Sequence, residues 1–199
     1  MPFGRRAPAP VDWLIVGLGN PGAEYDGTPH NVGFAVADLL TQRWDLGKPK
    51  ARYRGLYVDG RTGPAGSGGV RVAILKPQTY MNEAGKSVGP ARGELRVDLD
   101  RVLVIHDEID LAFGDIRTRL GGGLAGHNGL KSLKASLGSA DFRRVRIGVG
   151  RPPTTDPDRV AAYVLGRFRE SRDEVQMLIG RGADAAEQVL QEESGAVLD

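Results

Sequence analysis

The sequence predicts a single α/β domain with a mixed, mostly parallel twisted sheet and helices on both faces. Short apolar runs that suit buried strands alternate with segments of helical periodicity, and no internal repeat or domain-sized linker interrupts them. A chain of 199 residues is long enough to bury one continuous core. We expect this domain over 11–199. Residues 1–10 (MPFGRRAPAP) lead into no apolar signal segment, so a disordered tail is expected there.

Each element follows from the spacing of apolar residues. Strands are expected at 13–16, 53–58, 70–75, 101–105, 113–120 and 143–149. Helices are expected at 32–44, 82–95, 129–137 and 167–190, the last either continuous or broken. The strands at 53–58 and 70–75 should form a hairpin across the Gly-rich segment 60–69. The strand at 113–120 follows 101–105 so closely that a purely parallel sheet is not expected.

Composition narrows the class of protein. Hydrophobic residues make up 40% of the chain and charged residues 26%, which is typical of soluble globular proteins. No apolar run approaches the roughly 20 residues that a membrane-spanning helix needs. We therefore expect a cytoplasmic protein rather than a membrane protein, and the absence of cysteine agrees with that location.

Charge is distributed unevenly although the net charge is only +2. Segment 117–151 contains eight basic residues and one acid, whereas segment 169–199 contains three basic residues and eight acids. A polyanionic partner would contact the first segment and avoid the second. Charge alone fits ordinary solvated surfaces equally well.

Three polar clusters follow predicted strands, at 20–30, 76–82 and 106–110. In open α/β sheets, functional sites gather at the carboxyl ends of the strands. One of these clusters overlaps GLGNPG at 17–22, which matches the dinucleotide-binding pattern G-x-G-x-x-G. However, Gly27 and Pro29 extend the loop to about His30, and Asp38 lies inside the expected helix rather than at the end of a second strand. We therefore expect no nicotinamide or flavin cofactor.

The possible chemistries are few. The chain has no cysteine and no G-x-S-x-G serine, so a water nucleophile is favoured over a covalent one. His30, His106, His127, Asp107 and Asp110 are conceivable metal ligands, but they lack a metal-binding spacing and we expect no metal. A histidine base with a carboxylate partner remains, and His30 with Asp107 is the pair we favour. A lone histidine is more often structural, and we expect a core role for His106 and a capping or positioning role for His127.

A second informative segment is GGGLAGHNGL at 121–130. Its glycines allow close approach of backbone N–H groups, and the helix that follows favours a phosphate or carboxylate at its N-terminus. Arg119 and Lys131 flank it. For any single glycine here, a mobile surface loop remains the plainer interpretation.

Four segments together resemble one family. GLGNPGAEYDGTPHNVGF, KPQTYMNEAGKSV, HDEID and GGGLAGHNGLKSL occur in the order and at the spacing of bacterial-type peptidyl-tRNA hydrolases, over about 14–168. The resemblance implies hydrolysis of the ester between a peptide and the 3′-terminal ribose of tRNA, which recycles tRNA from peptides that drop off or stall. It also implies a monomer that works without a metal or cofactor.

The resemblance also implies roles for individual residues. His30 corresponds to the base that activates water, and Asp107 to the carboxylate that orients it. Asn20 corresponds to the residue that distinguishes N-blocked peptidyl from free aminoacyl substrates, and Asn82 to one near the scissile ester. Other positions implied to contact tRNA or peptide are Tyr25, Tyr80, Met81 and Asn128. Positions implied to face tRNA phosphates are Arg119, Lys131 and Arg146.

One position departs from the family pattern. The family usually has a basic residue before the catalytic histidine, where this chain has Pro29. Proline fixes φ and lacks an N–H, so the loop would be stiffer and one phosphate contact would be lost. This keeps open a second hypothesis, a non-catalytic RNA-binding paralogue, although the intact His30, Asp107, Asn20 and Asn82 argue against it.

Overall fold

A seven-stranded sheet forms the centre of the computed structural model, which describes residues 10–63 and 68–195. The strands are β1 (Trp13–Gly17), β2 (Lys50–Arg52), β3 (Gly55–Arg61), β4 (Arg71–Pro77), β5 (Val102–Glu108), β6 (Ile116–Leu120) and β7 (Arg143–Gly148). Their order in the sheet is β2-β3-β4-β1-β5-β7-β6. The tail expected at 1–10 lies outside the described residues except for Pro10, as does the middle of the 60–69 segment.

Strand directions confirm a mixed sheet. β4, β1, β5 and β7 pair in parallel, so their carboxyl ends meet at one edge. β3 pairs antiparallel with β4 as the predicted hairpin, and β6 pairs antiparallel with β7. The short edge strand β2 was not predicted, because three residues that are exposed or half-buried carry no readable pattern.

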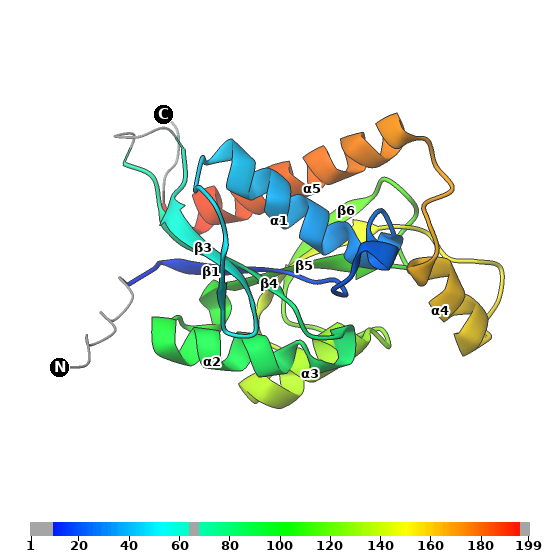
Figure 1. Cartoon of the computed structure of the whole chain (residues 1–199), viewed down its shortest axis with the longest axis horizontal. Helices are drawn as coiled ribbons and strands as arrows, with labels where there is room; N and C mark the ends of the chain where they lie inside the picture. The colour runs from blue at the N-terminus through cyan, green and yellow to red at the C-terminus, as the bar shows by residue number, and fades with distance from the viewer. Residues whose placement is uncertain (1–9, 64–67, 196–199) are drawn as a thin grey trace.

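Helices cover both faces of the sheet (Figure 1). The α-helices are α1 (Val32–Arg43), α2 (Gly85–Leu95), α3 (Asn128–Leu137), α4 (Pro157–Leu165) and α5 (Arg172–Glu193). Short 3-10 turns are η1 (Ala23–Tyr25), η2 (Pro29–Asn31), η3 (Met81–Glu83) and η4 (Leu99–Arg101). α1 and α5 lie over one face and α2 and α3 over the other, while α4 stands beyond the carboxyl edge (Figure 1). In the described part of the chain, the helices are too short or too polar to span a bilayer.

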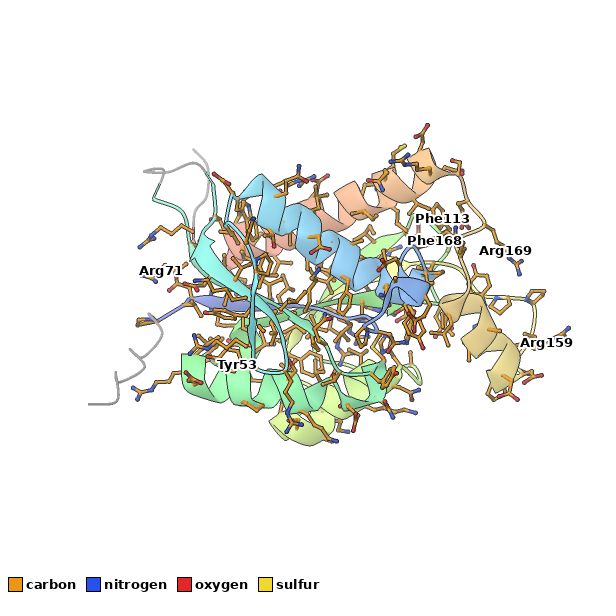
Figure 2. The ribbon with its side chains drawn as sticks, in the orientation of Figure 1. Tyr53, Arg71, Phe113, Arg159, Phe168 and Arg169 are labelled. Carbon is orange, nitrogen blue, oxygen red and sulfur yellow. The ribbon has the colours of Figure 1, made fainter. Side chains whose placement is uncertain are left out.

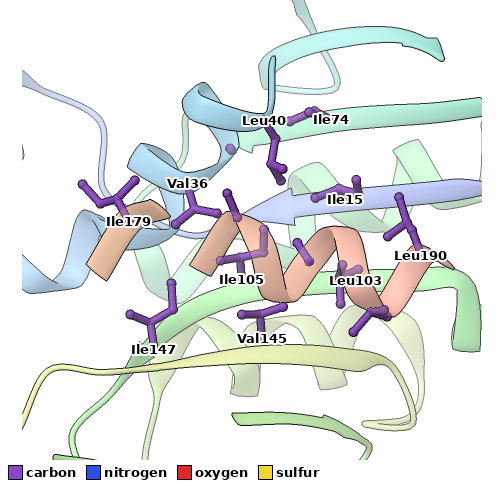
Figure 3. Packing of buried hydrophobic residues seen from close by; sticks show 14 of the residues in the cluster. Ile15, Val36, Leu40, Ile74, Leu103, Ile105, Val145, Ile147, Ile179 and Leu190 are labelled. Atoms are coloured by element: carbon purple, nitrogen blue, oxygen red, sulfur yellow. The ribbon is translucent and has the colours of Figure 1, made fainter. Parts of the chain in front are cut away.

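The hydrophobic core has two halves, one on each side of the sheet. Figure 3 shows Val36 and Leu40 of α1 and Ile179 of α5 near Ile15 and Ile105 of the central strands. The opposite half packs the other sides of the same strands against α2 and α3. The central strands are therefore buried on both faces, which explains why they read as continuous apolar runs in the sequence.

The carboxyl-terminal third of the chain differs most from expectation. Helix α4 was not predicted, although Asp156 caps it by accepting the N–H of Asp158, and Pro157 occupies its first position. Helix α5 begins at Arg172 rather than 167, because Ser171 and Glu174 form a capping box there. Capping residues mark the starts of both helices, but the prediction used apolar periodicity alone and missed them.

Helix α4 is joined to the sheet by a few contacts. The Tyr163 hydroxyl donates to the Val149 carbonyl at 2.7 Å. In the segment after α4, Phe168 meets Phe113 edge to face, with ring centroids 6.2 Å apart (Figure 2). Arg159 and Arg169 project outward from this region (Figure 2). Most of α4 therefore remains exposed, and it forms a wall at the carboxyl edge rather than part of the core.

Gly33 sets the distance between α1 and the sheet. A Cβ at this position would overlap the Ile105 carbonyl oxygen and lie 2.6 Å from the Leu18 backbone nitrogen. The start of α1 therefore approaches β5 more closely than any residue with a side chain allows. This contact places the preceding turn η2 beside the end of β5.

Candidate active site

A cavity of about 650 Å³ opens at the carboxyl edge of the parallel strands. Its walls come from the loop after β1, turn η3, the end of β5, the start of α3 and one side of α4. Its polar lining residues are Asn20, His30, Tyr80, Asn82, Asp107, Glu108, His127, Asn128, Arg151 and Thr155. The three polar clusters predicted at strand ends therefore converge on one site.

His30 and Asp107 form the central pair. Nδ1 of His30 lies 3.0 Å from each carboxylate oxygen of Asp107, and the two side chains are only 13% and 3% exposed. Burial disfavours the charged imidazole, but the Asp107 charge and hydrogen bond outweigh this and raise the pKa of His30. Because Nδ1–H donates to the carboxylate, Nε2 is the ring nitrogen left to accept a proton.

His127 is a second partner of the same carboxylate. Its Nε2 lies 2.9 Å from Oδ1 of Asp107, while its Nδ1 accepts the N–H groups of Gly129 and Leu130 and so caps α3. An accepting Nδ1 requires the proton to be on Nε2, so His127 donates to Asp107 through Nε2–H. Burial alone would raise the pKa of Asp107, but His30 and His127 together hold it well below its usual range.

This tautomer also bears on metal binding. His30, Asp107 and His127 each offer one ligand atom, and these atoms lie within 4.8 Å of one another. A metal on Nε2 of His127 would move its proton to Nδ1, which would displace the two backbone N–H groups that Nδ1 accepts. The cluster is therefore arranged for mutual hydrogen bonding rather than for ligation.

Asn20 is held in place by its neighbours. Asn31 accepts the Asn20 N–H at 2.8 Å and donates to the Asn20 carbonyl at 2.9 Å. Oδ1 of Asn20 accepts the Met81 N–H at 2.7 Å, which links the loop after β1 to turn η3. Because Oδ1 is occupied, the amide NH₂ of Asn20 is the group that remains for a ligand.

The remaining predicted substrate residues lie at different depths. Met81 is buried in the cavity wall, whereas Asn82 and Asn128 are exposed at its edge. Tyr80 stands at the rim with 58% of its surface exposed, which leaves its ring available for stacking. Tyr25 is half-buried in η1 and does not line this cavity.

One wall of the cavity is apolar. Val160, Ala161, Val164 and Leu165 of α4 line it, together with Ile109. Leu165 remains 38% exposed at the opening. The cavity therefore combines polar groups, His30 among them, with a hydrophobic wall.

Strands β6 and β7 carry four arginines on one face, because Arg117 pairs across the ladder with Arg146 and Arg119 with Arg144. Arg146 bonds to the buried Glu108 at 3.2 Å, and Arg144 is buried. Arg119, like Lys131 on α3, is exposed and makes no ion pair with the described residues. Of the three predicted phosphate contacts, Arg146 is thus already engaged with an acid.

His106 is the third histidine of the site. It is fully buried, its Nδ1–H donates to the Asp107 carbonyl at 2.7 Å, and its Nε2 has no partner among the described residues. Burial, with a further contribution from His127, lowers the pKa of His106 to about 3. Its ring lies edge-on to His127, with centroids 5.0 Å apart. The core role expected for His106 matches this environment.

The family of the chain follows from comparison with known proteins. Residues 14–198 match the family described as Peptidyl-tRNA hydrolase. The chain belongs to the peptidyl-tRNA hydrolase family. It is 48% identical over 178 residues to the peptidyl-tRNA hydrolase of Geobacillus kaustophilus, covering 89% of this chain and 92% of the relative. The enzyme of Mycobacterium sp. strain KMS is 50% identical over 175 residues, which is 87% of this chain and 88% of the relative.

Solved structures agree with this membership. The crystal structure of peptidyl-tRNA hydrolase from Acinetobacter baumannii is 33% identical, covers 93% of this chain and 91% of its own, and superimposes with a TM-score of 0.79. The predicted resemblance and α/β fold are thus confirmed, and the chain is by family an ester-hydrolysing enzyme. The argument against a dinucleotide site was that the glycine pattern at 17–22 does not lead directly into a helix. In the structure it leads into the 3-10 turns η1 and η2.

The roles of individual residues stay predictions, but the structure shows which of these residues line the cavity. His30, Asp107, Asn20, Met81, Asn82, Tyr80 and Asn128 share the cavity, and Tyr25 does not. Sequence reasoning assigned Asn31 no role and gave His127 no contact with the carboxylate. The capping role that was expected for His127 is confirmed, because its Nδ1 accepts the N–H groups of Gly129 and Leu130 at the start of α3. For Asn31 no local signal existed, because its partner lies 11 residues earlier in the chain.

Proposed function

We propose that this chain hydrolyses the ester bond between the peptide and the 3′-terminal ribose of peptidyl-tRNA, with His30 as general base. The observation that carries the proposal is the His30–Asp107 pair, 3.0 Å apart, at the wall of a cavity in a chain of this family. Nε2 of His30 removes a proton from water, and the carboxylate stabilises the imidazolium that forms. The water oxygen bonds to the ester carbonyl carbon, the bond from that carbon to the ribose oxygen breaks, and the imidazolium returns its proton to the departing ribose oxygen.

Three amides are placed to position the substrate. The NH₂ group of Asn20 is aligned by the bonds that hold its backbone and its Oδ1, which suits recognition of the peptide amide that free aminoacyl-tRNA lacks. Asn82 on η3 and Asn128 at the start of α3 both line the cavity, where uncharged donors can orient the ester and stabilise an oxyanion. The apolar wall from α4 accommodates the peptide side chains.

The tRNA partner is supported by the arginine face of β6 and β7. Arg119 and Lys131 are exposed and free to contact phosphates, which fix position without reading base sequence. Arg117, exposed on the same face, extends this surface. Arg146 contributes mainly by holding Glu108 at the end of β5. We further propose that the protein acts as a cytoplasmic monomer without a metal.

The test is release of an N-blocked amino acid from diacyl- or peptidyl-tRNA under single-turnover conditions, with and without a chelator. Wild-type release should survive chelation and fall by roughly 10²–10⁴-fold in His30→Ala, the range for losing a general base. Gln42→Ala, exposed on α1, is the control for handling and folding. Loss of release on chelation would overturn the metal-free mechanism.

A non-catalytic RNA-binding paralogue is the alternative, motivated by Pro29. This proline is buried at the first position of η2 and replaces the usual basic residue. The alternative predicts tRNA binding without turnover in the wild-type protein. Arg119→Gln serves both hypotheses: binding should weaken similarly across tRNA sequences, and the salt slope should fall by about one. An unchanged slope would remove Arg119 from the phosphate contacts.

A further inference from the structure

Arg144 on β7 is a buried cation without an acidic partner. It is 1% exposed, and no carboxylate of the described residues lies within ion-pair distance of it. Burial lowers the pKa of Arg144, and the positive charges of Arg119 and Arg146 lower it further. Buried charges are normally paired with an opposite charge, so this arrangement needs another explanation.

The guanidinium is directed at three backbone carbonyls, two of which belong to one loop. Its Nη1 donates to the Gly123 carbonyl at 2.6 Å, and its Nη2 donates to those of Gly122 at 2.9 Å and Ala140 at 3.3 Å. Its Cζ lies 5.0 Å from the ring centroid of Phe142. Arg144 thus connects β7 to residues 121–126, which we name the glycine loop.

The glycine loop has little conformational preference of its own. Gly121, Gly122, Ala125 and Gly126 all have positive φ, at 67°, 98°, 47° and 73°. Its backbone is bonded at the ends, where the Gly121 N–H donates to Phe142 and the Leu124 carbonyl accepts from His127. The Arg144 bonds fall between these ends, where glycines would otherwise leave the chain free to move.

The cavity depends on this loop. Ala125 and Gly126 line it, and His127 and Asn128 follow directly. A shift of the loop would separate Nε2 of His127 from Asp107, because that contact is a single hydrogen bond of 2.9 Å. We propose that Arg144 is a positioning residue of this enzyme, which fixes the glycine loop and thereby holds the His127 ring against Asp107. Its kinetic consequence rests on the function proposed above, whereas its structural consequence does not.

Arg144→Lys tests the proposal, because an ammonium group keeps the charge but cannot span two carbonyls in a plane. We expect kcat to fall about tenfold or more, since small displacements in a catalytic site have effects of this size, while KM and its salt dependence stay near wild type. In protein labelled with ¹⁵N-histidine, wild-type His127 should show the Nε2–H tautomer alone. The variant should show a mixture of both tautomers.

Arg101→Lys is the matched control. Arg101 also donates to a backbone carbonyl, that of Glu193 at 3.2 Å, and its Cζ lies 4.9 Å from the Trp13 ring centroid, but it is remote from the cavity. Arg101→Lys should lose less thermal stability than Arg144→Lys, because Arg101 is half-buried and makes one such bond rather than three, and it should leave kcat and the His127 signals unchanged. If Arg144→Lys does not fold, Arg144→Gln keeps a planar group with two N–H donors and takes its place.

Two results would overturn the proposal. One is wild-type kcat with an unchanged His127 spectrum in the Arg144 variant. The other is an equal loss of kcat in the Arg144 and Arg101 variants, which would reduce Arg144 to a general stabilising role. A wild-type protein without turnover would refute the proposed function instead, and the His127 spectrum would still decide whether Arg144 holds the loop.

Discussion

The loop that presents His30 is held by its own side chains, whereas the glycine loop that presents His127 is held from a neighbouring strand. In the first, Asn31 bonds to both backbone groups of Asn20, and the Thr28 hydroxyl donates to the Tyr25 carbonyl. In the second, Arg144 supplies the bonds from β7. Both loops deliver an imidazole to the same carboxylate of Asp107.

The two loops therefore take their geometry from different parts of the molecule. The His30 loop is held mainly by bonds within a short stretch of sequence, with one further bond from the Met81 N–H to Asn20. The glycine loop is permissive by itself and takes its geometry from the sheet. Substitutions should therefore impair one loop without impairing the other, and only Asp107 should couple them.

Asp107→Asn breaks both connections and should have the largest effect. The imidazolium at His30 loses its counter-charge and the ring loses its fixed tautomer, so kcat should fall by about 10³–10⁴-fold. Single-turnover release measures it, with circular dichroism as a folding control. Activity within tenfold of wild type would show that His30 does not depend on this carboxylate.

The pH profile of the same pair gives a second readout. His30 works as a base only when neutral, so kcat/KM should rise with pH through its pKa, which Asp107 raises above the ordinary 6.5. In Asp107→Asn, burial remains and the carboxylate is gone, so the residual activity should rise at lower pH than in wild type. If the rise in activity occurs at the same pH in both proteins, that rise reports the titration of another group.

Asn31→Ala loosens only the His30 loop. The buried N–H and carbonyl of Asn20 lose their partners, which should cost about 1–3 kcal/mol of stability per group. Turnover should fall about tenfold to a hundredfold because Asn20 and His30 shift together. Denaturant unfolding and kcat measure the two effects, with Gln42→Ala on α1, the helix that follows η2, as control. Wild-type kcat at reduced stability would show that the loop keeps its geometry without this clamp.

Substitution of His127 should affect only the glycine loop. Two variants separate its role as the cap of α3 from its hydrogen bond to Asp107. His127→Ala removes the α3 cap, at a cost of about 0.5–2 kcal/mol, together with the donor to Asp107. His127→Asn restores the cap but is too short to reach Asp107. We expect His127→Asn to recover the stability lost in His127→Ala, while kcat stays reduced to a similar extent in both variants. Recovery of both would make His127 a cap and nothing more.

His106 belongs to neither loop and should affect stability more than turnover. Its pKa falls to about 3 in the folded state, so the unfolded chain binds an extra proton as pH drops from about 6.5. Stability should therefore be lost as pH falls from about 6.5 to about 3, at up to about 1.4 kcal/mol per pH unit. His106→Gln should flatten this dependence in denaturant unfolding series. An equally steep series would assign the effect to other groups.

Sequence reasoning succeeded where the physical signal is local. The buried strands and α1 were predicted from apolar runs that are readable in one stretch. His30 and Asp107 lie 77 residues apart, and they were paired because each belongs to a polar cluster that follows a predicted strand. Sequence reasoning failed at α4, whose capping signal was present but unused, and at Arg144. No local pattern distinguishes Arg144 from the neighbouring Arg143 and Arg146. Only the pairing of β7 with β6 and the course of the glycine loop determine which arginine is buried.

At Gly33 the backbones of α1 and β5 pack directly against each other, with no side chain between them. Since η2 immediately precedes α1, the absence of a side chain at position 33 sets how far His30 stands from Asp107. A methyl group there would overlap the Ile105 carbonyl oxygen, so the start of α1, and His30 with it, would have to move away from β5. The hydrogen-bond distance between His30 and Asp107 thus depends on Gly33, a residue that does not line the cavity.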